Sequence, residues 1–423
     1  AEVGSVCRDS VKAGGVTGLP NPTGDSFYID FVAHEIGHQF SAEHSFNGTT
    51  SSCAAPNRWQ ASAFEPGGGS TIMSYAGICK SENIVNNADA VFHAGSIDYI
   101  DSFTTSGSGS NCGELLNISN PNEPVVDAGN DYTIPRKTPF ILTATGEDGD
   151  PDSLTYTWDQ MDAGTATTSS TLGTDLGNNS LFRSYLPRSE HTRHFPALGT
   201  TLQNKYDDSE NLACLSRSIN FRVTVRDGKS GIGKDNVGLS VDNGSGPFRI
   251  TSFNQSQSLS PGNYDINWDV ANTDKTPVNC SLIDISLLTF NFLKTSYSET
   301  PLARTDNDGS ATVTIGNILN SRARFKIQCS DNIFYDISDA DLTFTGGIAL
   351  STTGNKVDYN SAGLLMHDTP TESCITGDVA ENPTTDSSSG GGGTLNLYWL
   401  ISLFTLLSIR RRKSPSGEKE VIR

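Results

Sequence analysis

Basic residues are scarce in this chain. Only 29 of its 423 residues are Lys or Arg, against 48 that are Asp or Glu, which gives a formal net charge of −19 at pH 7. No cluster of basic residues occurs before the run Arg410–Lys413 near the C-terminus. Proteins that bind nucleic acid need clustered Lys and Arg to displace the counterions of the phosphate backbone. The composition therefore argues against nucleic acid as a partner.

The chain also lacks any Cys-x-x-Cys pair, which argues against a zinc site built from cysteine thiolates. Its eight cysteines instead indicate disulfides formed in an oxidising compartment, so we expect an exported protein. We expect Cys53 to pair with Cys79 and Cys280 with Cys329. A Cys7–Cys112 bridge would close the N-terminal part of the chain, but the partners of Cys7, Cys112, Cys214 and Cys374 stay open.

Histidine is rare as well, with seven in the chain, yet three stand in the eleven-residue window His34-Glu35-Ile-Gly-His38-Gln-Phe-Ser-Ala-Glu-His44. On an α-helix, residues i and i+4 share a face, so His34 and His38 can present two imidazoles to one metal ion. The chain must turn sharply after residue 39 or 40 to bring His44 back as a third ligand. Three neutral nitrogens leave one tetrahedral position open, which is typical of catalytic zinc. Histidines that only pack or hydrogen-bond are the alternative.

The segment that carries this window has a helical pattern. Asp25 or Ser26 can cap the start of the helix. An apolar stripe at helical spacing lies opposite the histidines. Its members are Ile29, Val32, Ile36 and Phe40. We therefore expect the histidines to line a cleft while the opposite face of the helix is buried.

The pattern His34-Glu35-x-x-His38-x-x-x-x-x-His44, followed by Thr-Ile-Met73-Ser-Tyr75, resembles the metzincin clan of zinc endopeptidases, and most closely its reprolysin-like branch. The resemblance implies that the three histidines bind Zn²⁺ and that Glu35 is the general base. It places Met73 in a tight turn under the imidazoles, and Tyr75 where some branches have an extra zinc ligand or a transition-state hydrogen-bond donor. An ordinary core methionine and a plain surface tyrosine are the alternatives.

Two features depart from that pattern. The clan usually has Gly at position 41, where the chain turns with positive φ, and here the residue is Ser41. A non-glycine residue in that conformation costs about 1 kcal/mol. The helix also begins only about 26 residues into the chain, whereas the clan builds a sheet-and-helix subdomain ahead of it. We therefore expect an N-terminally truncated fragment, in which residues 1–117 form an α+β catalytic half-domain that binds zinc but has little proteolytic activity.

Beyond Gly113 the composition changes to short alternating segments separated by Gly, Asn, Asp and Pro. The alternation around Trp158 and around Trp268 predicts strands. These tryptophans are 110 residues apart, about the size of one immunoglobulin-like sandwich. We expect two all-β Ig-like sandwiches, the first and PKD-like one at residues 125–243 and the second at 246–345. The tryptophans are expected to be core anchors, with a role as ligand platforms as the alternative.

The turn Glu147–Asp152 is rich in carboxylates, Glu-Asp-Gly-Asp-Pro-Asp. Oxygen ligands of this kind can hold Ca²⁺, although the spacing is not that of an EF-hand loop. A solvated acidic turn is the alternative.

The C-terminus predicts a membrane segment. Residues 346–393 read as a flexible linker that ends in four glycines, residues 394–409 are almost wholly apolar, and a basic end closes the segment 394–413. Sixteen helical residues span about 24 Å, a little short of a bilayer core of about 30 Å. The basic end would face the cytoplasm. The order of glycines, short apolar helix and arginines resembles the Gly-Gly-type sorting signals of Gram-negative bacteria, which are cut by a rhomboid-family membrane protease.

Together these features predict a multidomain protein: a metzincin-like half-domain, two Ig-like sandwiches and a short transmembrane helix. The expected function is that of a secreted or surface-anchored zinc metalloendopeptidase acting on extracellular proteins or peptides. Zinc would activate water, with Glu35 as the base. The alternative is a surface adhesion or matrix-binding protein with a remnant zinc domain.

Overall fold

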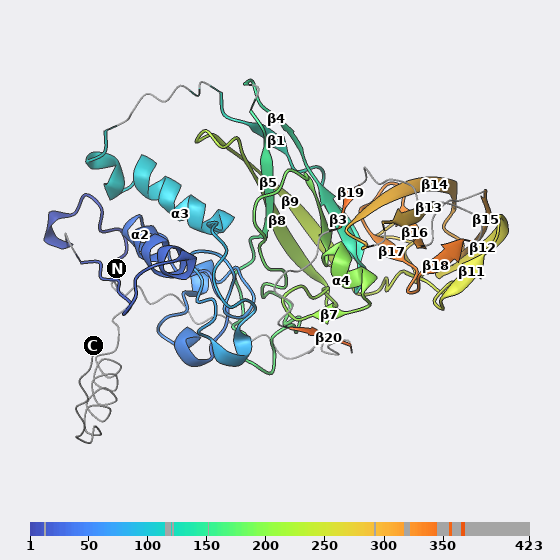
Figure 1. Cartoon of the computed structure of the whole chain (residues 1–423), viewed down its shortest axis with the longest axis horizontal. Coiled ribbons are helices and arrows are strands. Elements are labelled where there is room, and N and C mark those ends of the chain that lie inside the picture. Colours follow the sequence, from blue (N-terminus) through green and yellow to red (C-terminus); the bar gives the residue numbers. More distant parts are fainter. Residues whose placement is uncertain are drawn as a thin grey trace, which may run out of the picture.

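The computed structural model describes residues 1–11, 14–114, 120, 122–150, 152–291, 293–316, 322–344, 355–357 and 365–368. Within them, a small helical N-terminal part precedes many β-strands (Figure 1). The segment 394–413, expected to cross a membrane, lies outside these residues, as does most of the expected linker 346–393. Among the described residues, no helix combines the length and the apolar character that a bilayer span requires.

The N-terminal unit, residues 1–112, is built on one helical run and one later helix. The run consists of α1 (Asp25–Phe27), the π-helical segment Tyr28–Ala33 and α2 (His34–Gln39), and the later helix is α3 (Ala94–Thr105). Short 3-10 turns lie at Asp9–Val11, Ser51–Cys53, Gln60–Ser62, Lys80–Glu82 and Ser108–Asn111. Most of the unit is therefore loop, and its shape depends on cross-links and buried polar groups.

Two expectations about the helical run are wrong. Gly24 occupies the N-cap position and no side chain caps the helix, so neither Asp25 nor Ser26 has that role. The face opposite the histidines is not buried, because Ile36 is 46% exposed. α2 buries the side that carries the histidines, since its buried residues are His34, Gly37 and His38. Ile29 instead packs against the core cluster that contains Met73.

The expected disulfides are confirmed. Bridges join Cys7 to Cys112, Cys53 to Cys79 and Cys280 to Cys329. Cys214 is also disulfide-bonded, and Cys374 lies outside the described residues. The first two bridges cross-link the N-terminal unit, which has little regular secondary structure to hold it together.

The first β unit, residues 125–243, has a four-stranded sheet with the order β2-β9-β8-β5, in which β2 and β9 are parallel and the other pairs antiparallel. Two smaller pairs, β1-β4 and β3-β6, lie beside it. The elements are β1 (Val125–Asp127), β2 (Tyr132–Pro135), β3 (Phe140–Thr143), β4 (Thr145–Glu147), β5 (Thr155–Gln160), β6 (Thr192–Phe195), α4 (Leu198–Leu202), β7 (Tyr206–Asp207), β8 (Arg217–Arg226) and β9 (Ile232–Asp242).

The second β unit, whose strands begin with β10 and include β18 at residues 342–344, has a three-stranded sheet, β10-β12-β15. It also has a larger sheet in which β11, β18, β16, β13, β14 and β19 follow one another while β17 pairs with β16. Its strands are β10 (Arg249–Ile250), β11 (Gln257–Leu259), β12 (Gly262–Asp269), β13 (Leu282–Phe290), β14 (Ser296–Asp306), β15 (Ser310–Ile315), β16 (Ala323–Cys329), β17 (Tyr335–Ile337) and β18 (Leu342–Phe344). Two short strands add to the edges, β19 (Asn355–Lys356) on β14 and β20 (Met366–His367) on β7.

One hydrophobic core runs through both β units. Phe140 of β3 forms an antiparallel bridge with Phe334, which joins the first unit to the second. Trp158 and Trp268 are 3% and 4% exposed, so their expected role as core anchors is confirmed. Each indole N–H still has a partner, the carbonyl oxygen of His191 and the Oδ1 atom of Asn307.

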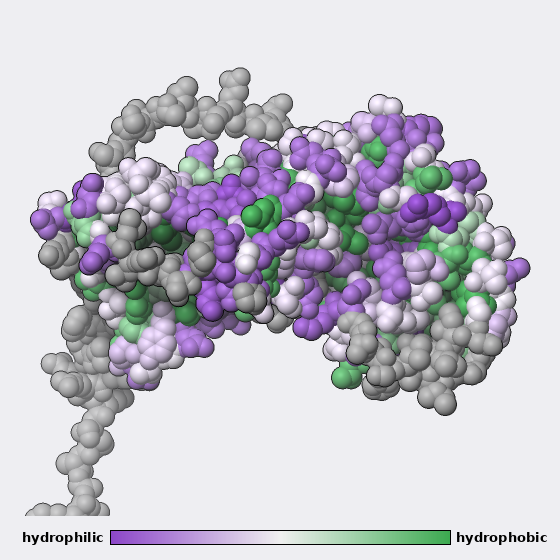
Figure 2. All heavy atoms as spheres, turned by 90° about the horizontal axis from the view of Figure 1, so that it is seen from above, coloured by the Kyte–Doolittle hydropathy of each residue, from purple (hydrophilic) through white to green (hydrophobic). Residues whose placement is uncertain are grey.

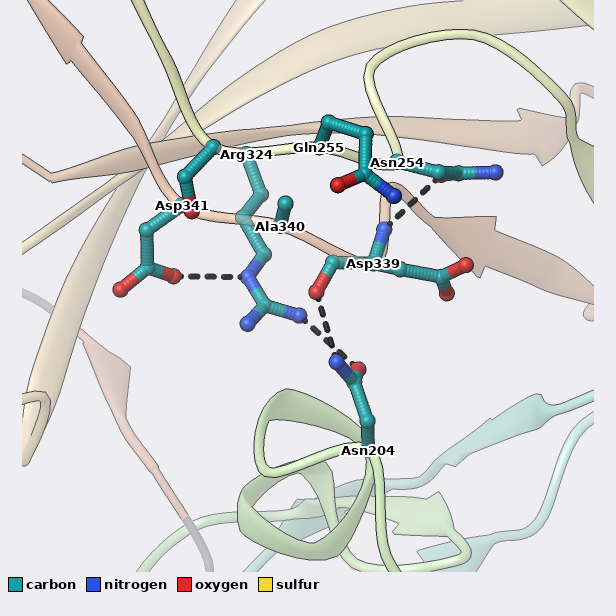
Figure 3. A pocket seen from close by; sticks show the side chains of 8 residues that line it. Asn204, Asn254, Gln255, Arg324, Asp339, Ala340 and Asp341 are labelled. Atoms are coloured by element: carbon teal, nitrogen blue, oxygen red, sulfur yellow. Dashed lines mark hydrogen bonds and ion pairs between the residues drawn. The ribbon is translucent and has the colours of Figure 1, made fainter.

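A polar pocket of about 340 Å³ lies where the chain after α4 meets the second β unit (Figure 3). Arg324 is buried there and donates to Asp341, to the Oδ1 atom of Asn204 and to the carbonyl oxygens of Ser338 and Leu202. Because the guanidinium already has protein partners on all three nitrogens, it fastens the two units together.

The surface reflects the acidic composition. Hydrophilic residues cover much of the face shown in Figure 2. In the acidic turn, Asp148 accepts a hydrogen bond from the backbone N–H of Asp150, and Asp152 pairs with Lys229. Within the described part of the chain, the turn does not bring three ligand side chains together, in contrast to the histidines described next.

Candidate metal centre

The three histidines of the sequence window converge in the N-terminal unit. His34 and His38 lie on α2, and Ser41, with φ of 74°, turns the chain back so that His44 faces them. The ring centroids are 4.7 Å apart for His34 and His38 and 4.6 Å apart for His38 and His44. All three side chains are buried, with exposures of 5 to 7%. The turn that the spacing required is present, with the non-glycine residue in the left-handed conformation.

Each ring is oriented by a backbone carbonyl. The Nδ1 atom lies 2.7 Å from the oxygen of Ile72 in His34, 2.8 Å from that of Ala42 in His38 and 2.6 Å from that of Asn57 in His44. A carbonyl oxygen can only accept, so each Nδ1 must carry the hydrogen. The Nε2 atoms are then left with free lone pairs, which is the tautomer that a metal ligand needs.

The Nε2 lone pairs point at a common position. The Nε2 atoms of His38 and His44 are 3.1 Å apart, and the ligand nitrogens of all three residues lie within 4.8 Å of one another. With both Nδ1 atoms protonated, neither Nε2 has a hydrogen to donate to the other, and a cation between the two lone pairs would satisfy both. In tetrahedral zinc with bonds of about 2.0–2.1 Å, ligand nitrogens are about 3.3 Å apart. The residues therefore fit a zinc ion.

Burial keeps the imidazoles neutral. It lowers the pKa of His34 to about 4 and, together with the neighbouring His34, that of His38 to about 3. The pKa of His44 lies well below its ordinary value for the same reasons. Metal ligands must be deprotonated, so these rings are ready to coordinate a cation at neutral pH.

Glu35 follows His34 on α2 and its side chain is 25% exposed. Its carboxylate forms an ion pair with the amino group of Ala1. The carboxylate next to the histidine cluster is therefore partly accessible to solvent.

Met73 lies against the helix that carries the histidines. Its side chain is fully buried, and a Cβ atom placed on Gly37 would come within 2.4 Å of its sulfur. The adjacent carbonyl of Ile72 orients His34, and the carbonyl of Met73 accepts from the N–H of Ser45. Only glycine at position 37 allows this contact, so the segment around Met73 forms a floor under two of the histidines.

Tyr75 lies beside the histidines rather than on the open surface. Its ring centroid is 4.5 Å from that of His44 and 5.8 Å from that of His34, and its ring stacks on Phe46. Burial raises the pKa of its phenol to about 12. The hydroxyl therefore keeps its proton at neutral pH and can donate a hydrogen bond.

One buried carboxylate that holds this arrangement was missed in the sequence. Glu65 is fully buried and accepts hydrogen bonds from Ser45, Ser70 and Thr71. It links the residue after His44 to the segment before Met73. A single Glu before the glycine run 67–69 carries no periodic signal, so sequence reasoning had no means of finding it.

The comparisons with known proteins bear on this part of the chain. Residues 1–102 match the family model described as metallo-peptidase family M12B, reprolysin-like. The matched span includes the three histidines, Glu35, Met73 and Tyr75, and it supports a reprolysin-like metallopeptidase domain there. Metallopeptidases of the M12 family use zinc. A search of curated proteins gave no match.

Among solved structures, similarity covers about half of this chain. The N-terminal Ig1-2 module of the Drosophila receptor protein tyrosine phosphatase DLAR is 8% identical, with 53% of this chain and 100% of that chain covered and a TM-score of 0.29. A chimeric titin Z1Z2 tandem is 14% identical, with 53% and 100% covered and a TM-score of 0.18. The Bacteroides ovatus glucan-utilisation protein SGBP-B is 14% identical, with 55% and 46% covered and a TM-score of 0.15. Scores this low carry no argument about function.

Proposed function

We propose that this chain is a zinc metalloendopeptidase that hydrolyses peptide bonds of extracellular proteins, exported and held at or released from the cell surface through residues 394–413. The observation that carries the proposal is the convergence of three Nε2 lone pairs, each fixed by a carbonyl on the opposite ring nitrogen. Structural histidines have no reason to aim three unprotonated nitrogens at one position.

His34, His38 and His44 would hold the metal through Nε2. When bound there, zinc supplies Lewis-acid polarisation of a carbonyl and lowers the pKa of water. With three protein nitrogens as ligands, such an ion would still have room for water or substrate. The buried, neutral imidazoles and the Met73 floor fix this geometry before substrate arrives.

The chain's own groups move the proton. Glu35 accepts a proton from the attacking water on its carboxylate and then delivers it to the nitrogen of the leaving amine. Its position next to His34 on α2 and its partial exposure support this role. The protonated phenol of Tyr75, beside His44, donates a hydrogen bond to the oxygen of the tetrahedral species.

The test is a zinc measurement combined with a cleavage assay on residues 1–423. We expect one zinc per chain and slow, zinc-dependent cleavage of a casein-type substrate. Glu35→Gln removes the base and keeps the shape, so cleavage falls by at least about 100-fold while zinc stays bound. The matched control is Glu123→Gln at an exposed position, which leaves cleavage unchanged.

Two outcomes contradict the proposal. The first is a chain that binds no zinc, and the second is cleavage that is the same in Glu35→Gln as in the parent protein. One zinc per chain with no Glu35-dependent cleavage favours the alternative function, a surface adhesion or matrix-binding protein with a remnant metal domain.

A further inference from the structure

The loop that carries His44 contacts both the N-terminal unit, to which it belongs, and the first β unit. Residues Ser45 to Gly48 lie beside Glu65 to Gly67, joined by the backbone bonds Asn47 N–H to Glu65 O at 2.8 Å and Gly48 N–H to Gly67 O at 2.7 Å. This side of the segment is internal to the N-terminal unit. It connects the third histidine to the floor that leads to Met73.

The opposite side of the same segment is taken by the first β unit. Residues 164–167 lie in the loop after the strand β5, which ends at Gln160. The N–H of Thr167 donates to the carbonyl of Asn47 at 3.1 Å, and Thr49 Oγ1 donates to the carbonyl of Thr167 at 2.8 Å. The amide of Asn47 also donates to the carbonyl of Thr165 at 2.9 Å. The His44 loop is thus enclosed between its own unit and the β unit.

Arg58 connects these contacts between the two units to the ring of His44. Its guanidinium donates to Oδ1 of Asn47 at 3.1 and 2.7 Å and to the carbonyl of Gly164 at 2.6 Å. The residue before it, Asn57, supplies the carbonyl that orients His44. Any rotation of the chain at Arg58 therefore moves the acceptor of the His44 ring.

The β unit also holds the floor of the site. Ser70 Oγ donates to the carbonyl of Ser184 at 3.3 Å, and Arg183 pairs with Asp89 at 3.1 Å. Asp89 and Ser70 are joined by a backbone hydrogen bond of 2.7 Å. Contacts from the same unit therefore reach both the third ligand and the segment before Met73.

His44 depends on this support more than the other two ligands. His34 and His38 are placed by one helix, whereas His44 comes from a loop with no regular structure around it. We propose that the first β unit is part of the metal centre, and that Arg58, clamped by Asn47 and Gly164, is a positioning residue that sets how tightly His44 holds the metal. This inference rests on the proposed zinc site, and it assigns a role in that site to a unit outside the family match.

The test compares zinc dissociation constants of variants of residues 1–423 by competition with a chromophoric chelator. Groups that orient a metal ligand are worth about 10- to 100-fold in metal affinity. We expect Arg58→Ala to raise the zinc dissociation constant within that range and to alter the visible spectrum of the cobalt-substituted protein. Arg58→Lys, which keeps the charge but loses the forked geometry, recovers only part of the loss.

The matched control is Arg222→Ala. Arg222 also bridges the two units, through an ion pair with Asp98 on α3, but it does not touch the His44 loop. It should change the melting temperature of the zinc-free protein as much as Arg58→Ala does, and leave zinc affinity and the cobalt spectrum unchanged. If Arg58→Ala does not fold, Thr49→Val removes only the hydroxyl bond to Thr167 and gives the same comparison with a smaller loss.

The outcomes separate this inference from the proposed function. If the parent protein binds zinc and Arg58→Ala binds it equally well, the inference is wrong and the zinc site stands. Equal losses in Arg58→Ala and Arg222→Ala also overturn it, because they would reflect general loosening between the units. If the parent protein binds no zinc, the proposed function itself fails.

Discussion

Gly37 offers a quantitative test of the contact between α2 and Met73. A Cβ atom at this position would lie 2.4 Å from Sδ of Met73 and 3.0 Å from Cε1 of Phe92. Alanine normally favours a helix interior over glycine by about 1 kcal/mol. Overpacking a filled core costs about 1–3 kcal/mol. We therefore expect Gly37→Ala to destabilise the protein by about 1 kcal/mol rather than to stabilise it.

A double-mutant cycle isolates the contact. In a Met73→Ala background the clashing sulfur is absent, so Gly37→Ala should become neutral or stabilising, with a coupling free energy of about 2 kcal/mol. The assay is calorimetric thermal unfolding of the parent protein, the two single variants and the double variant, each freed of zinc by a chelator. Zinc titration of the same four proteins follows. Gly37→Ala should also weaken zinc binding, because the displaced methionine supports the carbonyl that orients His34. A stabilising effect of Gly37→Ala that is the same in both backgrounds would refute the packing argument.

Three further predictions concern other features. Replacing both Cys53 and Cys79 by Ser removes a bridge with a sequence separation of 26, so the chain-entropy model predicts a loss of about 3–4 kcal/mol in unfolding free energy. The comparison protein is the double variant Cys280→Ser/Cys329→Ser, which removes the bridge in the second β unit. Substitution Tyr75→Phe should lower the turnover number about 10- to 100-fold with the Michaelis constant and zinc content unchanged, whereas unchanged turnover would leave Tyr75 a packing residue. Buried His194 has its pKa lowered to about 3, so it is neutral when folded and protonates on unfolding below pH 6.5. The contribution of neutral His194 to the free energy of unfolding is fully present above pH 6.5 and falls by about 2 kcal/mol by pH 5. His194→Gln should reduce that fall, and an unchanged melting-temperature profile between pH 5 and 7 would contradict it.

The convergence of the three histidines was predictable from their spacing in the sequence. His34 and His38 share a helical face by spacing alone, and the need for a sharp turn before His44 follows from the length of the segment. Ser41 satisfies that turn with a positive φ despite its side chain. The orientation of the rings was not predictable, because it depends on carbonyls of Ile72 and Asn57 that no side-chain pattern marks.

The helix itself shows where local patterns fail. An apolar stripe at 3.6-residue spacing predicts one buried face only if the helix stays regular, and the π-helical segment Tyr28–Ala33 breaks that condition. Further along, α2 buries His34, Gly37 and His38, and Ile36 lies on its exposed side. The N-cap was missed for a related reason, since Gly24 leads into the helix with φ of 89° and leaves Asp25 inside the first turn.

The long-range polar contacts could not be predicted from the sequence. Alternation predicted the strands around Trp158 and Trp268, and both tryptophans are buried. Nothing in the sequence indicated that the chain after β5 would hydrogen-bond to Asn47, or that Glu65 would collect five donor groups. Such contacts join residues that are distant in sequence, so only the folded chain reveals them.

X-ray absorption at the zinc edge tests the central claim most directly. For residues 1–423 with one zinc bound, we predict imidazole nitrogens at about 2.0–2.1 Å as the only protein ligands and no sulfur. His44→Ala should lower the number of imidazoles by one. Sulfur in the coordination sphere, or an imidazole count that His44→Ala leaves unchanged, would contradict a zinc ion held by His34, His38 and His44.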